Sequence, residues 1–204
     1  MGAPAAYSAL MAMTADPPPA LEDRSDDRPA SAVFLDLDTV LLAMHPGRRG
    51  LELGLQADLP GAIERFEQVA EKIIVLVEPT PQEGGNGRET ALRLEVLREG
   101  LGPLVDRLII AQCPHGEDGT CDCSKPACGL VELAVAEHNV VARDSWHIGA
   151  DAEGVQAGRG AGLRTIRVGP VADDHLSNVH RADHEARDLL DAANWILLEA
   201  LPVP

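Results

Sequence analysis

The chain has 204 residues, of which 45% are hydrophobic, and a formal net charge of -16 at pH 7. A chain of this length and composition can bury the core of one ordinary domain. Aromatic residues make up only 2%, so aliphatic side chains must fill that core. The acidic balance argues against nucleic acid and anionic membranes as partners, because like charges repel and no Lys/Arg-rich patch offsets them.

No apolar run approaches the ~18 residues of a membrane span. The first residues lack the basic segment and the continuous apolar core of a signal peptide. All four cysteines fall between positions 113 and 128, with a histidine among them. This clustering suits metal binding in a reducing compartment better than disulfide bonds, so we expect a cytoplasmic protein.

Residues 1–30 are rich in Ala, Pro and Asp, and we interpret them as a disordered lead-in without a function of its own. Residues 31–204 are expected to form one domain. Strands and helices should alternate in it, with strands over 32–37, 73–77, 106–112, 145–150 and 164–169 and helices over 60–72, 88–102, 129–139, 153–162 and 185–201. This order predicts an α/β fold, a Rossmann-like three-layer sandwich with a mostly parallel sheet and an inserted zinc-binding loop. Ligands of such folds bind beyond the carboxyl ends of the strands.

The polar loop 112–128 contains four candidate zinc ligands in close spacing, Cys113, His115, Cys121 and Cys123. Three thiolates and one imidazole are the donors of a closed, structural zinc site. The loop cannot order itself through an apolar core, so a metal would supply the free energy of ordering. Free or disulfide-linked cysteines are the alternative. Cys128 lies outside the pattern and is expected to be a small, partly buried residue.

Two acidic residues, Asp36 and Asp38, end the first expected strand in the run VFLDLDTVLL. Alternate strand residues point to the same side, so the two carboxylates are expected to converge at the carboxyl edge of the sheet. Such a pair suits a nucleophile and a general acid/base, with Mg2+ balancing the charge. A plain acidic strand end is the alternative, because D-x-D alone is a common pattern.

Three segments together, VFLDLDTVLL, CPH…CDCSKPACGL and DSWHIGADAEGVQAGRGAG, resemble the haloacid dehalogenase superfamily of phosphatases over about residues 32–200. Their order and spacing are similar to the D-glycero-D-manno-heptose 1,7-bisphosphate phosphatase and histidinol-phosphate phosphatase families, which have a Cys/His zinc loop before a Lys-Pro pair. The resemblance implies that Asp36 is a nucleophile forming an aspartyl-phosphate and that Asp38 is the general acid/base. Lys125 would bind the phosphate and balance the charge of Asp36; a solvated loop lysine is the alternative. Mg2+ would be held by Asp36 and Asp38, and by Asp151 if its turn relaxes.

The second, third and fourth motifs of the superfamily are altered. The second motif ends its strand in Thr or Ser followed by Asn, whereas this chain has Val77 and Glu78. Valine offers phosphate no hydrogen bond, and Glu78 adds a repulsion of roughly 1–4 kcal/mol at about 4 Å. Thr80 substitutes only if the strand end shifts. In the third motif, Ser124 replaces an Arg that contacts substrate.

The fourth motif reads Gly-Asp-x-x-x-Asp in the superfamily, but here Ala150 and Gly154 stand at the two acidic positions. The neighbouring acids, Asp151 and Glu153, are each displaced by one residue. The loss of a carboxylate weakens a site for Mg2+, an ion that dehydrates reluctantly.

The remaining histidines receive no catalytic role. His147 should lie on the face of its strand opposite to Trp146 and Ile148, as a packed or solvated residue. Three others are expected in a solvated acidic loop, His175, His180 and His184.

The leading hypothesis is a monomeric, Mg2+-dependent phosphatase with a structural Zn2+ that hydrolyses a sugar or polyol (bis)phosphate. The alternative is a catalytically impaired pseudoenzyme that binds a phosphorylated metabolite or a protein partner. A purely structural zinc domain is a more distant third interpretation.

Overall fold

The computed structural model describes residues 28–47, 50–79, 88–115, 121–170 and 181–200. Most of the expected lead-in therefore lies outside the described residues. Ala30 falls within them; it is buried and pairs in parallel with Val140. In the described part of the chain, no helix is long and apolar enough to cross a membrane.

The centre of the molecule is a parallel sheet. Its strands are β1 Ala32–Asp36, β4 Lys72–Val77, β5 Ile109–Gln112, β6 Trp146–Gly149, β7 Arg164–Val168 and β8 His184–Ala186. Within the described residues the six strands lie in the order β5-β4-β1-β6-β7-β8, and every neighbouring pair is parallel. Nearly all residues of the central strands β1 and β4 are buried, as expected for strands covered on both faces.

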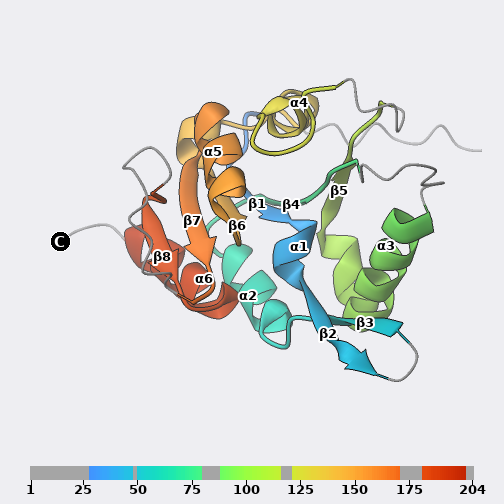
Figure 1. Cartoon of the computed structure of the whole chain (residues 1–204). Helices are drawn as coiled ribbons and strands as arrows, with labels where there is room; N and C mark the ends of the chain where they lie inside the picture. Colours follow the sequence, from blue (N-terminus) through green and yellow to red (C-terminus); the bar gives the residue numbers. More distant parts are fainter. Residues whose placement is uncertain (1–27, 48–49, 80–87, 116–120, 171–180, 201–204) are drawn as a thin grey trace, which may run out of the picture.

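Helices cover both faces of this sheet (Figure 1). One face packs against α2 Leu59–Phe66, α3 Arg88–Leu101 and α6 Leu189–Ala200. The other packs against α4 Gly129–Glu137 and α5 Ala152–Gly160. The expected three-layer α/β architecture is thus confirmed.

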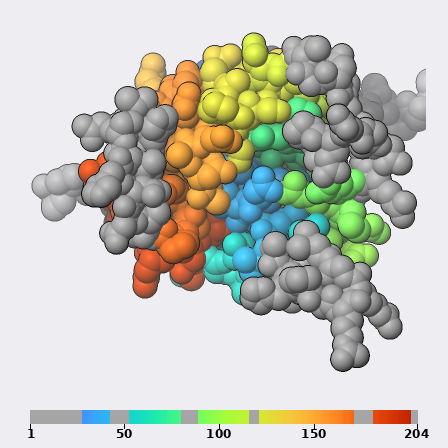
Figure 2. All heavy atoms as spheres, in the orientation of Figure 1, coloured from blue at the N-terminus to red at the C-terminus, as the bar shows by residue number. Residues whose placement is uncertain are grey.

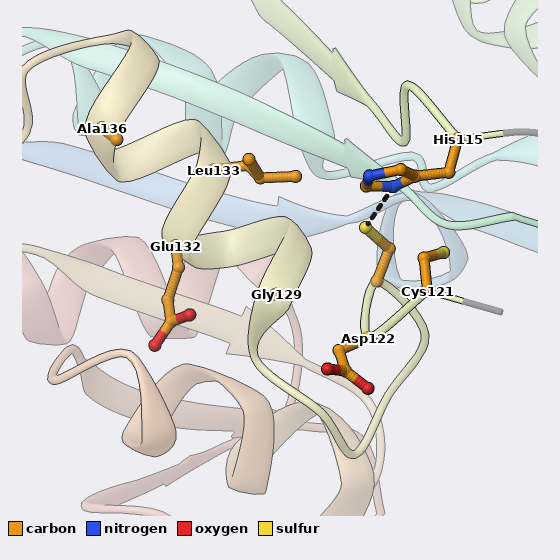
Figure 3. A pocket seen from close by; sticks show the side chains of 8 residues that line it. His115, Cys121, Asp122, Gly129, Glu132, Leu133 and Ala136 are labelled. Atoms are coloured by element: carbon orange, nitrogen blue, oxygen red, sulfur yellow. Dashed lines mark hydrogen bonds between the residues drawn. The ribbon is translucent and has the colours of Figure 1, made fainter.

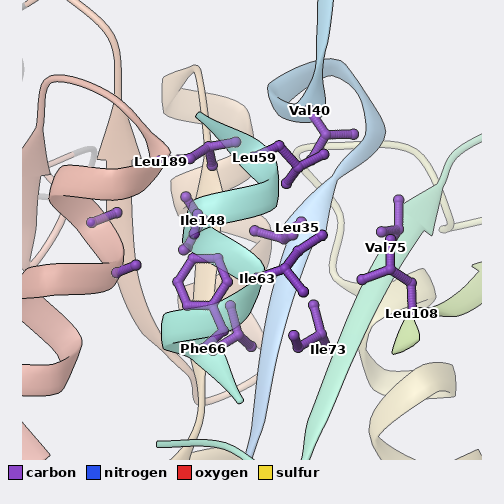
Figure 4. Packing of buried hydrophobic residues seen from close by; sticks show 14 of the residues in the cluster. Leu35, Val40, Leu59, Ile63, Phe66, Ile73, Val75, Leu108, Ile148 and Leu189 are labelled. Carbon is purple, nitrogen blue, oxygen red and sulfur yellow. The ribbon is translucent and has the colours of Figure 1, made fainter. Parts of the chain in front are cut away.

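The alternation of β1 divides the core into two clusters. Val33 and Leu35 point to the α2 side, where Leu35 lies close to Ile63 of α2 (Figure 4). Phe34 points to the α4 and α5 side. Asp36 follows Phe34 in the same alternation, so it belongs to the face that also bears the Cys/His loop.

Several elements differ from the expected ones. A single helical turn, α1 Leu37–Val40, follows β1 directly, and an antiparallel hairpin comes next, formed by β2 Leu41–Gly47 and β3 Gly50–Leu55. Neither was predicted. The helix expected over 60–72 ends at Phe66, and a 3-10 helix at Gly102–Arg107 shortens the strand expected over 106–112.

The last helix also begins later than residue 185. The Asp188 carboxylate accepts a hydrogen bond from the backbone N–H of Asp191 at 2.7 Å, which caps α6 so that it starts at Leu189. The preceding residues, His184–Ala186, form strand β8 instead.

Candidate functional site

Asp36 is the last residue of β1, at the carboxyl edge of the sheet, and its side chain is almost fully buried. Figure 2 shows the segment that contains it, in blue, near the centre of one face and bordered by orange and green segments far away in sequence. A buried carboxylate needs partners, because desolvation penalises its charge.

Two side chains provide these partners. Lys125 Nζ lies 3.2 Å from Asp36 Oδ2, and His147 Nε2 lies 2.9 Å from Oδ1. Burial alone would raise the pKa of Asp36, but His147 and Lys125 outweigh it and hold the pKa below its usual value. Asp36 is therefore ionised at neutral pH, as a nucleophilic carboxylate must be.

Lys125 gathers three carboxylates around one ammonium group. Its Nζ lies 3.6 Å from Glu78 Oε1 and 3.6 Å from Asp151 Oδ2, in addition to Asp36. Burial lowers the pKa of Lys125, but these three negative charges raise it above its ordinary value. Lys125 stays charged, and its position beside Asp36 is not that of a solvated loop lysine.

Glu78 directly follows β4 and accepts a hydrogen bond from the backbone N–H of Lys125 at 3.3 Å. Burial raises its pKa to about 7, with Lys125 opposing the shift and the Asp36 charge adding to it. The carboxyl is therefore partly protonated near neutral pH. The repulsion expected from Glu78 toward a phosphate is accordingly reduced.

Asp38 lies on α1 and not on a strand, and its side chain is 60% exposed. It pairs with Arg93 of α3. Asp36, Asp38, Glu78 and Arg93 nevertheless line one small cavity, so the structure brings the two predicted aspartates together. The turn of α1, and not strand alternation, places Asp38 there.

Asp151 is the N-cap of α5. Its Oδ1 accepts a hydrogen bond from the backbone N–H of Gly154 at 2.7 Å. The backbone approaches Asp36 closely at the two glycines of this turn: a Cβ would lie 2.7 Å from Asp36 Oδ2 at Gly154 and 2.9 Å from it at Gly149. A side chain at either position would crowd the Asp36 carboxylate.

These contacts do not fit a magnesium ion held by Asp36, Asp38 and Asp151. Each oxygen of Asp36 has a partner, Asp38 pairs with Arg93, and one oxygen of Asp151 caps α5. Mg2+ requires near-octahedral oxygen ligands, which the present arrangement does not gather.

His147 is a site residue that the sequence did not reveal. It lies on the face of β6 opposite to Trp146 and Ile148, as alternation predicts, but it is buried and hydrogen-bonded to Asp36. The register of β1 against β6, which pairs Phe34 with His147, creates this contact. Strand alternation predicts on which face of the sheet His147 lies. Its hydrogen-bond partner depends on the register of the neighbouring strand.

The Cys/His loop brings its four candidate ligands together, with donor atoms within 4.8 Å of one another. Cys113 Sγ lies 3.6 Å from Cys121 Sγ and 3.5 Å from His115 Nδ1, and Cys123 Sγ lies 3.4 Å from His115 Nδ1. Figure 3 shows His115 and Cys121 of this cluster. A tetrahedral ion with typical Zn–S and Zn–N bonds separates its ligands by about 3.5–3.8 Å. The donor set and its spacing therefore fit zinc.

The Cys/His loop, called the zinc-type loop below, contacts the strand next to Asp36. Cys113 donates its backbone N–H to the Val77 carbonyl at 3.2 Å, at the end of β4. Cys123 is buried, and Lys125 follows it by two residues. The Lys125 ammonium therefore reaches Asp36 from a position two residues after a candidate zinc ligand. Cys128 is partly buried and donates its thiol to Glu132 Oε1 at 3.4 Å, outside the cluster as expected.

His184 was expected in a solvated acidic loop, but it begins strand β8. His184 stacks on Trp195 of α6, with ring centroids 4.3 Å apart. Thr80, His175 and His180 lie outside the described residues.

Comparison with known proteins identifies relatives of the chain. No family model matches the chain. D-glycero-β-D-manno-heptose-1,7-bisphosphate 7-phosphatases are 30% identical: that of Yersinia pestis over 85% of this chain and 93% of its own length, and that of Pasteurella multocida over 70% and 85%.

Solved structures agree in fold. D,D-heptose 1,7-bisphosphate phosphatase from B. bronchiseptica, complexed with magnesium and phosphate, is 21% identical, with a TM-score of 0.62 over 83% of this chain and 99% of that one. A proposed HAD-like phosphatase from Mesorhizobium loti is 19% identical, also with a TM-score of 0.62, over 86% and 89%. The chain therefore belongs to the haloacid dehalogenase superfamily and, within it, to the family of the D-glycero-β-D-manno-heptose-1,7-bisphosphate 7-phosphatases.

Proposed function

We propose that the chain is a phosphatase-type hydrolase that acts on a sugar or polyol phosphate through an aspartyl-phosphate at Asp36. The observation that carries this proposal is the buried, ionised Asp36 carboxylate paired with Lys125 at the carboxyl edge of the sheet. The named activity of the 30% identical relatives supports the substrate class.

The chemistry proceeds in two displacements. An Asp36 oxygen attacks the phosphorus and forms a new O–P bond while the bond to the sugar oxygen breaks. Asp38 protonates that leaving oxygen and, as a carboxylate, then takes a proton from the water that hydrolyses the aspartyl-phosphate. Asp38 must leave Arg93 to reach the substrate, which its exposed position allows. Lys125 balances the charge on the phosphoryl oxygens and on Asp36.

Zinc has a structural part in this proposal. Cys113, His115, Cys121 and Cys123 would hold the ion and leave no open coordination position. The bound ion would keep the loop folded and Lys125 beside Asp36.

A second candidate is a domain of the same fold that binds a phosphorylated metabolite or a protein partner without turnover. Compared with the second and fourth motifs of the superfamily, this chain has Val77 in place of a phosphate hydrogen-bond donor. It has Ala150 and Gly154 in place of two carboxylates. These substitutions remove contacts that assist phosphoryl transfer but leave Lys125 as an anion-binding group.

Phosphate release distinguishes the two candidates. Zinc-loaded protein is assayed with D-glycero-β-D-manno-heptose 1,7-bisphosphate and with a panel of sugar and polyol phosphates, with and without Mg2+. We expect turnover that falls by at least about 10³-fold in Asp36→Asn, because the amide removes the nucleophile. Asp144→Asn, at an exposed aspartate near the start of β6, is the matched control and should keep full activity.

Equal rates in wild type and Asp36→Asn would refute the hydrolase proposal. Saturable binding of a phosphorylated sugar without phosphate release would favour the second candidate.

A further inference from the structure

His147 supplies Asp36 with a second buried polar partner. The His147 ring is almost fully buried, and its Nε2 lies 2.9 Å from Asp36 Oδ1, while Lys125 occupies the other oxygen. An ionised carboxylate can only accept hydrogen bonds, so Nε2 carries the proton and donates it. Both oxygens of the candidate nucleophile are thus bound by groups of the chain itself.

The position of the ring is built into the fold. At Gly158 of α5, a Cβ would lie 2.6 Å from both Cβ and Nδ1 of His147. Only glycine lets α5 pack this closely over the ring. His147 Nδ1 has no hydrogen-bond partner within the described part of the chain. The Asp36 contact therefore accounts for the orientation of a buried ring that is otherwise polar and unpaired.

Among the described residues near Asp36, the carboxylates of Asp38, Glu78 and Asp151 already have cationic partners. Ala150 and Gly154 stand at the positions that are acidic in the superfamily pattern, and Asp151 uses one oxygen to cap α5. The other Asp151 oxygen lies 3.6 Å from Lys125 Nζ. A divalent cation here would have to compete with the Lys125 ammonium and the Nε2 proton for these carboxylate oxygens.

We propose that His147 and Lys125 together take the place of a divalent cation at Asp36, so that this site does not bind Mg2+. The proposal relies on the proposed function for the role of Asp36, but its test measures ion binding and needs no turnover. His147 acts through Asp36 and is therefore a positioning residue.

The direct test is Mg2+ titration of the zinc-loaded full chain, followed through the imidazole nitrogen signals of His147 in 1H–15N spectra. His147→Gln, in which the signals vanish, assigns them. We expect the His147 signals to stay unchanged while exposed carboxylates of this acidic protein bind Mg2+ weakly. A saturable shift of the His147 signals on Mg2+ addition would overturn the proposal, whether or not the protein is a phosphatase.

A double variant at residues 147 and 150 should bind Mg2+ at Asp36. His147→Met removes the donor, and Ala150→Asp, at an exposed position, returns a carboxylate. In calorimetric titration the double variant should bind Mg2+ at least about tenfold more tightly than wild type, and adding Asp36→Asn should abolish the gain. His147→Gln combined with Ala150→Asp retains a donor and should show less of the gain.

Destabilisation alone does not create a binding site, so a gain cannot arise from a loosened fold. Circular dichroism checks that the variants fold. A folded double variant that binds Mg2+ no better than wild type would contradict the role given to His147. If that variant does not fold, the His147 signals of the wild-type chain decide the question.

Discussion

The Lys125 ammonium is shared by Asp36, Glu78 and Asp151, whose carboxylate oxygens lie 3.2, 3.6 and 3.6 Å away. One positive charge cannot balance three negative charges, and Glu78 responds with a pKa raised to about 7 by burial and by the Asp36 charge. Asp36 instead has its pKa lowered, because His147 adds to the effect of Lys125. Asp36 and Glu78 thus share the Lys125 cation but have pKa shifts of opposite direction. The acid with the lowered pKa, Asp36, is the candidate nucleophile.

The Glu78 shift predicts a pH-dependent difference in stability. The folded protein binds a proton at Glu78 up to about pH 7, whereas the unfolded chain loses it near the ordinary glutamate pKa of 4.5. Glu78 therefore lowers stability as pH rises through this window. The Gln side chain of Glu78→Gln cannot ionise, so the free energy of unfolding of this variant should exceed that of wild type by roughly 1–2 kcal/mol at pH 8. This value is discounted because the carboxyl is partly exposed.

Urea unfolding of both proteins at pH 5 and pH 8 measures this difference, and the pH dependence of the zinc site cancels because both proteins contain it. Glu64→Gln, at an exposed glutamate of α2, is the matched control for the substitution itself. A Glu78→Gln advantage that is the same at pH 5 and pH 8 would rule out a raised pKa as its cause.

The zinc-type loop connects β5 to α4 and contributes Lys125 to the site. Cys113 and Cys123 belong to the core cluster on the α4 side, whereas His115 is exposed. His115 and Cys121 line an open groove of about 500 Å³ along α4, which Leu133 also lines. Figure 3 shows these three side chains. Apart from its cysteines the loop sequence is mostly polar, so metal ligation is the interaction expected to order it.

Metal analysis should find about one zinc per chain. Cys121→Ser should lose most of it and lower the free energy of unfolding by roughly 2–5 kcal/mol at saturating zinc, because the ion binds the folded loop. Cys128→Ser is the matched control: this cysteine is also partly buried but lies outside the cluster, so zinc content should stay at one. Equal zinc content in the two variants would exclude the four-ligand site.

Elements with strong local patterns could be predicted, whereas those held by distant contacts could not. The apolar run of β4 and the spacing of the zinc-type ligands are visible in the sequence. Strand β8 has only one buried residue, and side chains distant in sequence hold it: Arg167 Nε donates to Glu185 Oε2 at 2.8 Å, and Asp183 accepts from Thr165. The His147 contact with Asp36 likewise depends on the pairing of two strands 111 residues apart in sequence.

At the scale of the whole molecule, the parallel sheet gathers residues from distant segments at its carboxyl edge. Asp36 ends β1, Glu78 follows β4, His147 lies on β6, and Lys125 enters from the zinc-type loop. The net charge of -16 would repel an anionic substrate at long range. Salt screens that field beyond about 8 Å, and within that range the Lys125 ammonium is positioned beside Asp36 to contact a phosphate.

The proposed mechanism requires Asp36 to form a covalent phosphoryl intermediate. Borohydride added during turnover reduces an aspartyl-phosphate to homoserine, which peptide mass spectrometry locates in the chain. We predict substrate-dependent homoserine at residue 36 in the zinc-loaded protein and none in Asp36→Asn. Phosphate release without homoserine at residue 36, or with homoserine at another aspartate, would contradict a nucleophilic role of Asp36.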